Sequence, residues 1–233
     1  MLDIFIEGEV IDLRIPTLEL AETSDWYKWF NHPHTTAFLE HGVFPNTREK
    51  QIEFFKRAMD ERLLLMVTNK DGTIIGSTSL MNIDYKTRTA GSGLVIGDFI
   101  CKNPLEALEA VARITEHGFC KLGLKRIEAA QHIKLIPWSH RMSLIGYRLE
   151  GIFQKAFVKG IEVVDVLRIS AHYDDYEKII ASRGGGYGIL KKKCLSVLKN
   201  FQSHLSTKNF KSFLKNPKSI IIIFLHHKEK QCF

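Results

Sequence analysis

The stretch that decides the fold pairs "TAGSGLVIG" at residues 89–97 with "KNPLEALEAVARITEHGF" at residues 102–119. The first part is short and rich in glycine and aliphatic residues, which predicts a β-strand. The second part opens on Asn103 and Pro104 and continues with apolar residues at helical spacing. Asparagine suits an N-cap and proline suits the first helical position, so we expect a helix from Pro104 to about Leu122.

The start of this helix has two interpretations that the pattern leaves open. The first is a well-capped core helix, because Glu106 completes a capping box and Leu105 begins an apolar stripe. The second is a phosphate site, because a helix N-terminus offers free N–H groups and partial positive charge, and Lys102 adds a full charge beside it. Glu106 opposes the second interpretation, since its carboxylate would lie near the same anion.

Patterns on either side of this unit predict a mixed sheet. Alternating or continuous apolar runs predict strands at 8–16, 63–69, 73–84, 89–97 and 125–133, with a closing hairpin over 147–173 that turns at Lys159-Gly160. Helical spacing predicts helices at 18–32, 46–62, 104–122 and 138–146. The strand, helix and strand across 89–133 should form a parallel crossover. The side chains of Trp26, Trp29 and Phe30 are expected chiefly in the core.

Charge and composition divide the chain near residue 182. The net charge of +7 combines a net +9 from residue 184 onward with a net −2 over residues 1–183. We therefore expect a domain over 1–181, a glycine-rich linker over 182–188 and a lysine-rich extension over 189–233. The extension fits disorder or a loosely held amphipathic helix, and the near-neutral body gives little reason to expect nucleic-acid binding.

Several protein classes are disfavoured by the same composition. The longest apolar run, 220–225, is too short to span a bilayer, and the N-terminal residues lack the basic region of a secretory signal. The four cysteines lie far apart with no CxxC pair, which disfavours a zinc site or a disulfide framework. We expect no metal, no transmembrane segment and a cytoplasmic location.

Four short patterns follow one another along the chain: "GLVIG" at 93–97, "HGFCKLGLKRIE" at 117–128, "GYRLEG" at 146–151 and "VVDVLRIS" at 163–170. Together they resemble the GNAT acetyltransferase superfamily over roughly residues 8–176, most closely the branch of ribosomal-protein and spermidine N-acetyltransferases. This resemblance implies an α/β (α+β) fold: a twisted, mostly antiparallel sheet of about seven strands with helices on both faces and one parallel β-α-β unit.

The resemblance also implies acetyl-CoA as cofactor. In the family, backbone amides of the central strand bind the pantetheine, and the strand–helix junction binds the pyrophosphate. The candidate cofactor-binding residues at the matching positions of this chain are Leu94, Val95, Ile96, Gly97, Lys102, Asn103, Pro104, Leu105, Glu106 and Ala107. Trp138 is a further candidate. Lys102 replaces the family's basic residue, while Leu105 stands where the family has glycine.

The catalytic and acceptor residues are implied less directly. "FLEHG" at 38–42 lies in the region that forms the acceptor pocket in this branch and offers Glu40 and His41 as bases. A solvated loop histidine is the alternative interpretation. Leu135 and Met142 occupy the family's asparagine and tyrosine positions, so the usual acid is missing. The remaining candidates are Asp84 and Ser139 for catalysis, and Asn31, His32 and His132 for contacts with the acceptor.

The expected activity is acetyl transfer from acetyl-CoA to the primary amine of a small molecule, for which an amino sugar attached to a nucleotide is one candidate. A protein N-terminal acetyltransferase and a non-catalytic GNAT-like binding module are the alternatives. A fourth and weaker hypothesis is a protein that binds nucleic acid or a membrane through its basic extension. We expect no requirement for nucleic acid, and a homodimer is one possible assembly.

Overall fold

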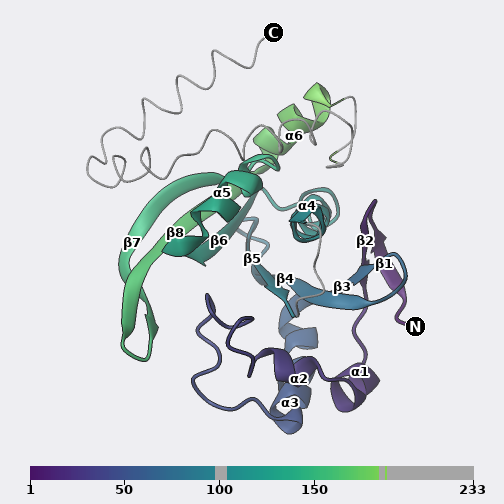
Figure 1. The fold of residues 1–233 in the computed structure, drawn as a ribbon. Helices are drawn as coiled ribbons and strands as arrows, with labels where there is room; N and C mark the ends of the chain where they lie inside the picture. The colour runs from purple at the N-terminus through teal and green to yellow at the C-terminus, as the bar shows by residue number, and fades with distance from the viewer. Residues whose placement is uncertain (98–103, 184–186, 188–233) are drawn as a thin grey trace. The chain divides into compact units, whose positions relative to one another are not determined.

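The computed structural model describes residues 1–97, 104–183 and 187, shown as the coloured ribbon in Figure 1. Within these residues one sheet has the strand order β1-β2-β3-β4-β5-β6-β8-β7. Only β5 and β6 pair in parallel, and every other neighbouring pair is antiparallel. The strands are β1 (Ile4–Glu7), β2 (Ile11–Arg14), β3 (Arg62–Asn69), β4 (Ile74–Asp84), β5 (Thr89–Ile96), β6 (Arg126–His132), β7 (Arg148–Lys159) and β8 (Glu162–His172). The predicted fold class is confirmed, with one strand more than expected.

The helices follow the predicted order with two differences. They are α1 (Leu18–Thr23), α2 (Trp26–Trp29), α3 (Arg48–Glu61), α4 (Pro104–Cys120), α5 (Ile136–Ser143), which follows a 3-10 turn (Ile133–Leu135), and α6 (Tyr173–Ser182). The single helix predicted at 18–32 is wrong: Ser24 is extended, and its hydroxyl accepts the Trp26 N–H, which starts a second helix. Sequence analysis did not anticipate α6.

The extra strand is β1, which precedes the segment predicted as one strand at 8–16; that segment contains only β2. The chain turns back between β1 and β2, and the carboxylate of Glu109 on α4 holds this turn. It accepts backbone N–H groups of Glu9 at 2.6 Å, Val10 at 2.7 Å and Ile11 at 3.2 Å. Arg113, one turn along α4, pairs with the same carboxylate at 3.2 Å. A contact between residues so far apart in the sequence cannot be predicted from the local spacing of apolar residues.

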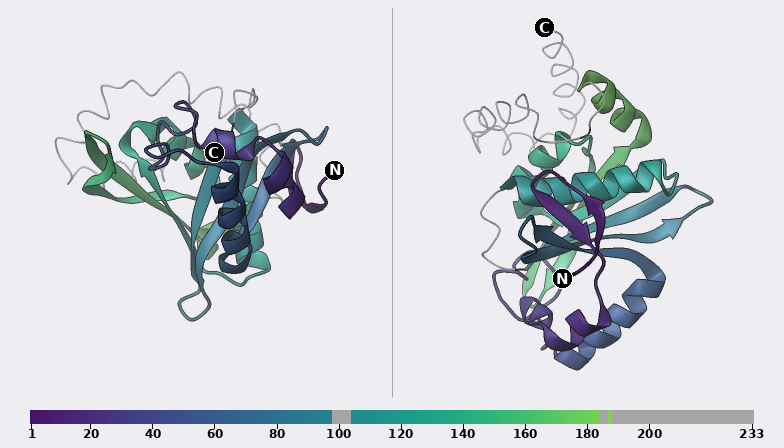
Figure 2. Two further views of the ribbon diagram at one scale, coloured as in Figure 1. Left: turned by 90° about the horizontal axis from the view of Figure 1, so that it is seen from below. Right: turned by 90° about the vertical axis from the view of Figure 1, so that its right-hand side faces the viewer.

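Helices cover both faces of the β2–β5 part of the sheet (Figures 1 and 2). On one face α4 packs against β2, β4, β5 and β6, and on the other α3 packs against β3 with α1 and α2 beside it. The core on the α3 side contains Trp26, Phe30 and Met66, all buried, with Trp29 packed against them. The expectation that these aromatic side chains lie in the core is confirmed.

Tyr187 lies inside the segment expected to be a linker. Its side chain is buried, its ring centroid lies 4.7 Å from that of Tyr176 on α6, and its hydroxyl donates to the Ile145 carbonyl at 2.5 Å. The chain is therefore anchored at this residue. The expected extension over 189–233 lies outside the described residues.

Candidate active site

The parallel pair β5–β6 separates within the sheet. It is in register only from Thr89↔Arg126 to Gly91↔Glu128. Beyond it, Ser92–Ile96 keep their β4 partners on one side but have no β6 partner on the other. These five residues are half-buried although β5 lies in the middle of the sheet. The gap leaves backbone N–H and C=O groups of the predicted cofactor strand open to a ligand.

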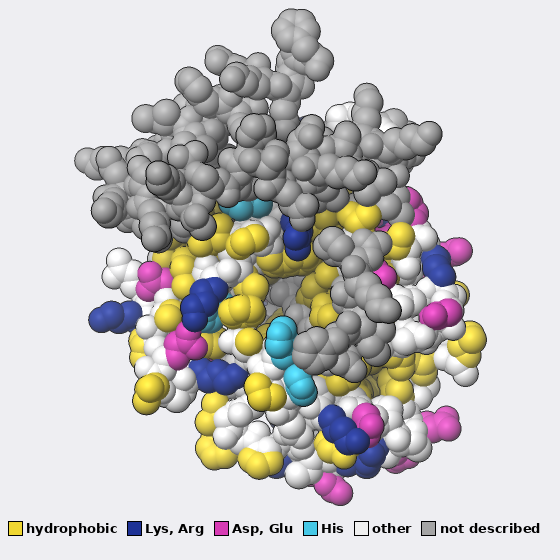
Figure 3. Space-filling view, viewed as in Figure 1, with side chains coloured by type: hydrophobic (Ala, Val, Ile, Leu, Met, Phe, Trp, Pro, Cys, Tyr) yellow, Lys and Arg dark blue, Asp and Glu magenta, His cyan; other side chains and the backbone are white. Residues whose placement is uncertain are grey.

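Figure 3 shows a hollow at this position. Hydrophobic side chains gather around it, and histidine side chains lie at its lower edge. Predicted residues Leu94, Val95, Ile96 and Gly97 lie at the end of β5, where the two strands have parted.

The first turn of α4 is the predicted phosphate site. Leu105 is 7% exposed, so its side chain packs into the protein instead of occupying the outer surface of the helix end. Glu106 and Ala107 are half-buried. The first N–H groups of an α-helix have no partner within the helix itself. Lys102 and Asn103 lie outside the described residues, and of Pro104 only the helical backbone is described.

The loop between α2 and α3 closes over the ends of three strands. Its own ends are joined because the Asn31 side chain donates to the Asn46 carbonyl and accepts the Asn46 N–H, both at 2.7 Å. From within the loop, the Thr35 hydroxyl donates to the carbonyl of Gly97 after β5 at 3.0 Å. Lys159 at the end of β7 donates to the Thr36 carbonyl at 2.6 Å. We call residues 31–46 the α2–α3 loop. It forms one wall of the gap, and Asn31 joins the two ends of the loop.

The predicted bases Glu40 and His41 lie on this loop. Both are exposed, and the His41 ring centroid is 5.0 Å from that of Phe30. Burial on that side lowers the pKa of His41, and the Lys159 ammonium lowers it further, while Glu40 raises it. A lowered pKa keeps the imidazole neutral at pH 7, which is the form that accepts a proton from an amine. His32 lies at the start of the same loop and is exposed.

His132 ends β6 and is enclosed, with a side chain 0% exposed. Its ring lies between Phe38 of the α2–α3 loop and Phe157 of β7, with centroids 5.1 Å and 4.7 Å away. Nδ1 accepts the Lys134 N–H at 3.1 Å, and Nε2 points at Glu162 Oε1, 3.5 Å away. Direct contact with a substrate, as expected from the sequence, would require these aromatic neighbours to move.

Two predicted residues lie on α5, which follows β6. Trp138 is half-buried, and Ser139 is hydrogen-bonded to the Gln131 amide of β6. Met142, at the family's tyrosine position, is 2% exposed and faces the core. A buried thioether cannot donate a proton, so an acid for this site must come from another position.

Asp84 lies apart from the other candidates. It faces Thr89 at the beginning of β5, whereas Gly97 follows the end of that strand. Thr89 and Ile96 are about 23 Å apart at 3.3 Å per residue. The Asp84 carboxylate accepts the N–H groups of Lys86 and Thr87 in the β4–β5 turn, which lowers its pKa. The structure gives Asp84 a turn-stabilising role.

Sequence reasoning missed a charged network on β6, β7 and β8. The Arg126 guanidinium pairs with Glu150, and its hydrogen bonds hold the pKa of that carboxyl at about 2. Glu128 pairs with Arg126 at 3.3 Å and with Arg168 at 3.0 Å. The network lines a shallow cavity of about 200 Å³. The Arg126-Ile127-Glu128 and Glu150-Gly151 patterns pointed to these residues but not to their pairing.

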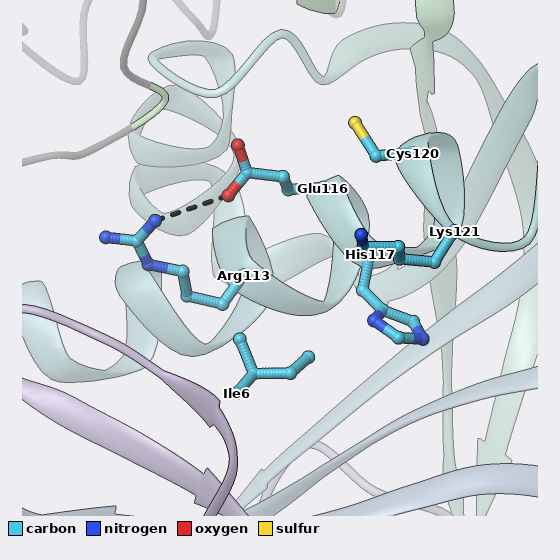
Figure 4. Close-up of a pocket in the computed structure, with 6 residues that line it drawn as sticks. All are labelled: Ile6, Arg113, Glu116, His117, Cys120 and Lys121. Carbon is cyan, nitrogen blue, oxygen red and sulfur yellow. Dashed lines mark hydrogen bonds and ion pairs between the residues drawn. The ribbon is translucent and has the colours of Figure 1, made fainter.

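A second cavity, of about 290 Å³, lies along the outer side of α4. Figure 4 shows the side chains that line it, with Arg113 paired to Glu116. The cavity extends to Lys121, just beyond the C-terminal end of α4. None of the residues that line it belongs to β5 or β6. This cavity is therefore separate from the gap between β5 and β6.

Residues 12–134, more than half of the chain, match the family model described as an acetyltransferase (GNAT) domain. The chain therefore belongs to the GNAT acetyltransferase family, a family of acetyl-CoA-dependent acyltransferases. No curated protein matches the sequence.

Solved structures share the fold at low sequence identity. Spermidine N-acetyltransferase from Vibrio cholerae, in complex with CoA and spermine, is 16% identical with a TM-score of 0.65, covering 72% of this chain and 98% of that one. The microcin C7 self-immunity acetyltransferase, in complex with acetyl-CoA and AMP, is 21% identical with a TM-score of 0.60, covering 71% and 93%. A GNAT acetyltransferase from Bacillus anthracis is 23% identical with a TM-score of 0.61, covering 72% and 98%.

The described residues fit acetyl-CoA. The open edge of Ser92–Ile96 supplies backbone groups in the gap, and the first turn of α4 supplies N–H donors for an anion. Leu105 does not occupy the outer surface, because its side chain is buried. Within the part of the chain that the structure describes, no helix has the length and apolar character needed to cross a membrane.

Proposed function

We propose that the protein is an acetyl-CoA-dependent N-acetyltransferase that acylates the primary amine of a small molecule. The observation that carries the proposal is the end of β5–β6 pairing at Gly91 and Glu128, which leaves the rest of β5 without a strand neighbour on that side. When bound, acetyl-CoA supplies an activated acetyl thioester. The chain supplies backbone donors to hold it and a wall, the α2–α3 loop, to position the amine.

His41 is the base that the geometry favours among the predicted candidates. It lies on the wall of the gap, and the pKa lowered by burial keeps it neutral at pH 7. Ser139 hydrogen-bonds to Gln131 on β6 and is retained as a candidate proton donor.

An amino sugar attached to a nucleotide is our candidate acceptor. A structural relative that binds AMP supports this choice, because a nucleotide can occupy a related fold. A protein N-terminus is the second candidate, from the resemblance to the ribosomal-protein branch. We also propose a cytoplasmic location, consistent with the widely spaced cysteines. A homodimer is supported by the exposed hydrophobic side chains of the β7–β8 hairpin, Phe153, Val158, Ile161 and Val163, and light scattering tests it.

Cofactor binding and turnover test the proposal separately. We expect acetyl-CoA to raise the thermal unfolding midpoint of the full chain by mass action. We also expect CoA release when amines are added. A midpoint that stays unchanged at millimolar acetyl-CoA would favour the non-catalytic binding module. A different outcome would favour the second candidate: acetyl-CoA stabilises the protein, no small amine causes CoA to be released, and a peptide N-terminus is acetylated.

A further inference from the structure

The face of β6 and β8 that points away from α4 carries acidic side chains, among them Glu128 and Glu162. Directly paired residues of antiparallel strands share a face, so Glu128 and His132 lie on the same face as their β8 partners Ser170 and Val166. Even-numbered residues of β8, including Glu162, follow on that face because side chains alternate along a strand. We call this surface the β6–β8 outer face.

The carboxylates of this face differ in their partners. Glu128 and Glu150 are both bound to arginine guanidinium groups in the network around Arg126. Glu162 pairs instead with the ammonium of Lys134 at 3.0 Å. The Lys134 side chain is 64% exposed, so this pair is weak and easily separated.

A buried histidine lies behind the Glu162 carboxylate. His132 Nδ1 accepts the Lys134 backbone N–H, so the proton of the neutral ring lies on Nε2. That N–H points at Glu162 Oε1 from 3.5 Å, and Nε2 has no hydrogen-bond partner among the described residues. The ring cannot turn away easily because Phe38 and Phe157 pack on it.

We propose, on the basis of the proposed function, that Glu162 binds the ammonium group of the acceptor and that His132 positions the Glu162 carboxylate. In the present structure the Lys134 ammonium occupies the place of the acceptor's ammonium and leaves when the acceptor binds. Phe38, 39% exposed on the α2–α3 loop, provides an apolar wall beside it.

Three full-length variants test the role of Glu162. Glu162→Gln should raise the KM for phenethylamine about tenfold or more, since a charge-assisted contact is lost, with the KM for acetyl-CoA unchanged. Lys134→Ala should lower the KM for the amine, because a competing ammonium is removed. Glu53→Gln, on the exposed side of α3, is the matched control and should change neither value. Equal KM values for the wild type and Glu162→Gln would overturn the proposal.

Direct binding separates this proposal from the proposed function. Binding of phenethylamine to the wild type and to Glu162→Gln is measured by calorimetry, without acetyl-CoA turnover. Amine binding that is lost in Glu162→Gln supports the proposal even if no CoA is released. Absence of amine binding to the wild type overturns it. A thermal midpoint of Glu162→Gln equal to that of the wild type shows that folding is intact.

Discussion

Replacing Gly97 with alanine tests the contact between α2 and the end of β5. A Cβ atom built at Gly97 overlaps ring atoms Cδ2, Cε2 and Cε3 of Trp29, so the indole must move. Overpacking of this kind costs about 1–3 kcal/mol, and losing the Thr35 hydrogen bond to the Gly97 carbonyl adds about 1 kcal/mol. The free energy of unfolding should therefore fall by about 2–4 kcal/mol, and the thermal midpoint by about 6–12 °C.

Urea unfolding followed by circular dichroism measures this loss. Gly151→Ala is the matched control, because an added Cβ there meets nothing within 4 Å, and it should change stability little. In the double variant Gly97→Ala/Trp29→Leu, the smaller side chain should restore about 1 kcal/mol or more relative to the sum of the single changes. We also expect Gly97→Ala to weaken stabilisation by acetyl-CoA. Unchanged stability of Gly97→Ala, or strictly additive effects, would refute the assigned contact.

Two further predictions concern buried polar groups. Glu109→Ala leaves three backbone N–H groups of the β1–β2 turn without their acceptor, so urea unfolding should show a loss of about 2–4 kcal/mol, and a loss below about 0.5 kcal/mol would contradict this role. Burial raises the pKa of Tyr147 to about 12. Because its neutral form is favoured in the folded state, stability is complete below pH 10 and falls by about 1.4 kcal/mol per pH unit between pH 10 and 12. Tyr147→Phe should make this alkaline fall shallower, and an identical slope in both proteins would argue against it.

Local patterns predicted most of the fold because most elements depend on local signals. Asp71-Gly72 marked the β3–β4 turn, and Gly72 adopts the positive φ of 90° that glycine tolerates. Thr47 starts α3 because its side chain accepts the Lys50 N–H. The failures had non-local causes: the β1–β2 turn depends on Glu109, about a hundred residues away, and the break before α2 depends on one serine hydroxyl.

The candidate site was predictable only in part. Periodicity and resemblance located the end of β5 and the start of α4, but not the enclosure of His132 between Phe38 and Phe157. Glu162 carried no signal in the sequence, because a glutamate next to a hairpin turn usually faces solvent. Its relation to His132 arises only when β6 and β8 pair.

The two asparagines that join the ends of the α2–α3 loop make that loop a self-contained unit. Since Asn31 and Asn46 fasten it at its base, the residues between them can vary in length and chemistry while the sheet beneath keeps its register. Grafting the corresponding segment from another family member between these two positions is therefore a direct route to exchanging acceptor preference on an unchanged scaffold.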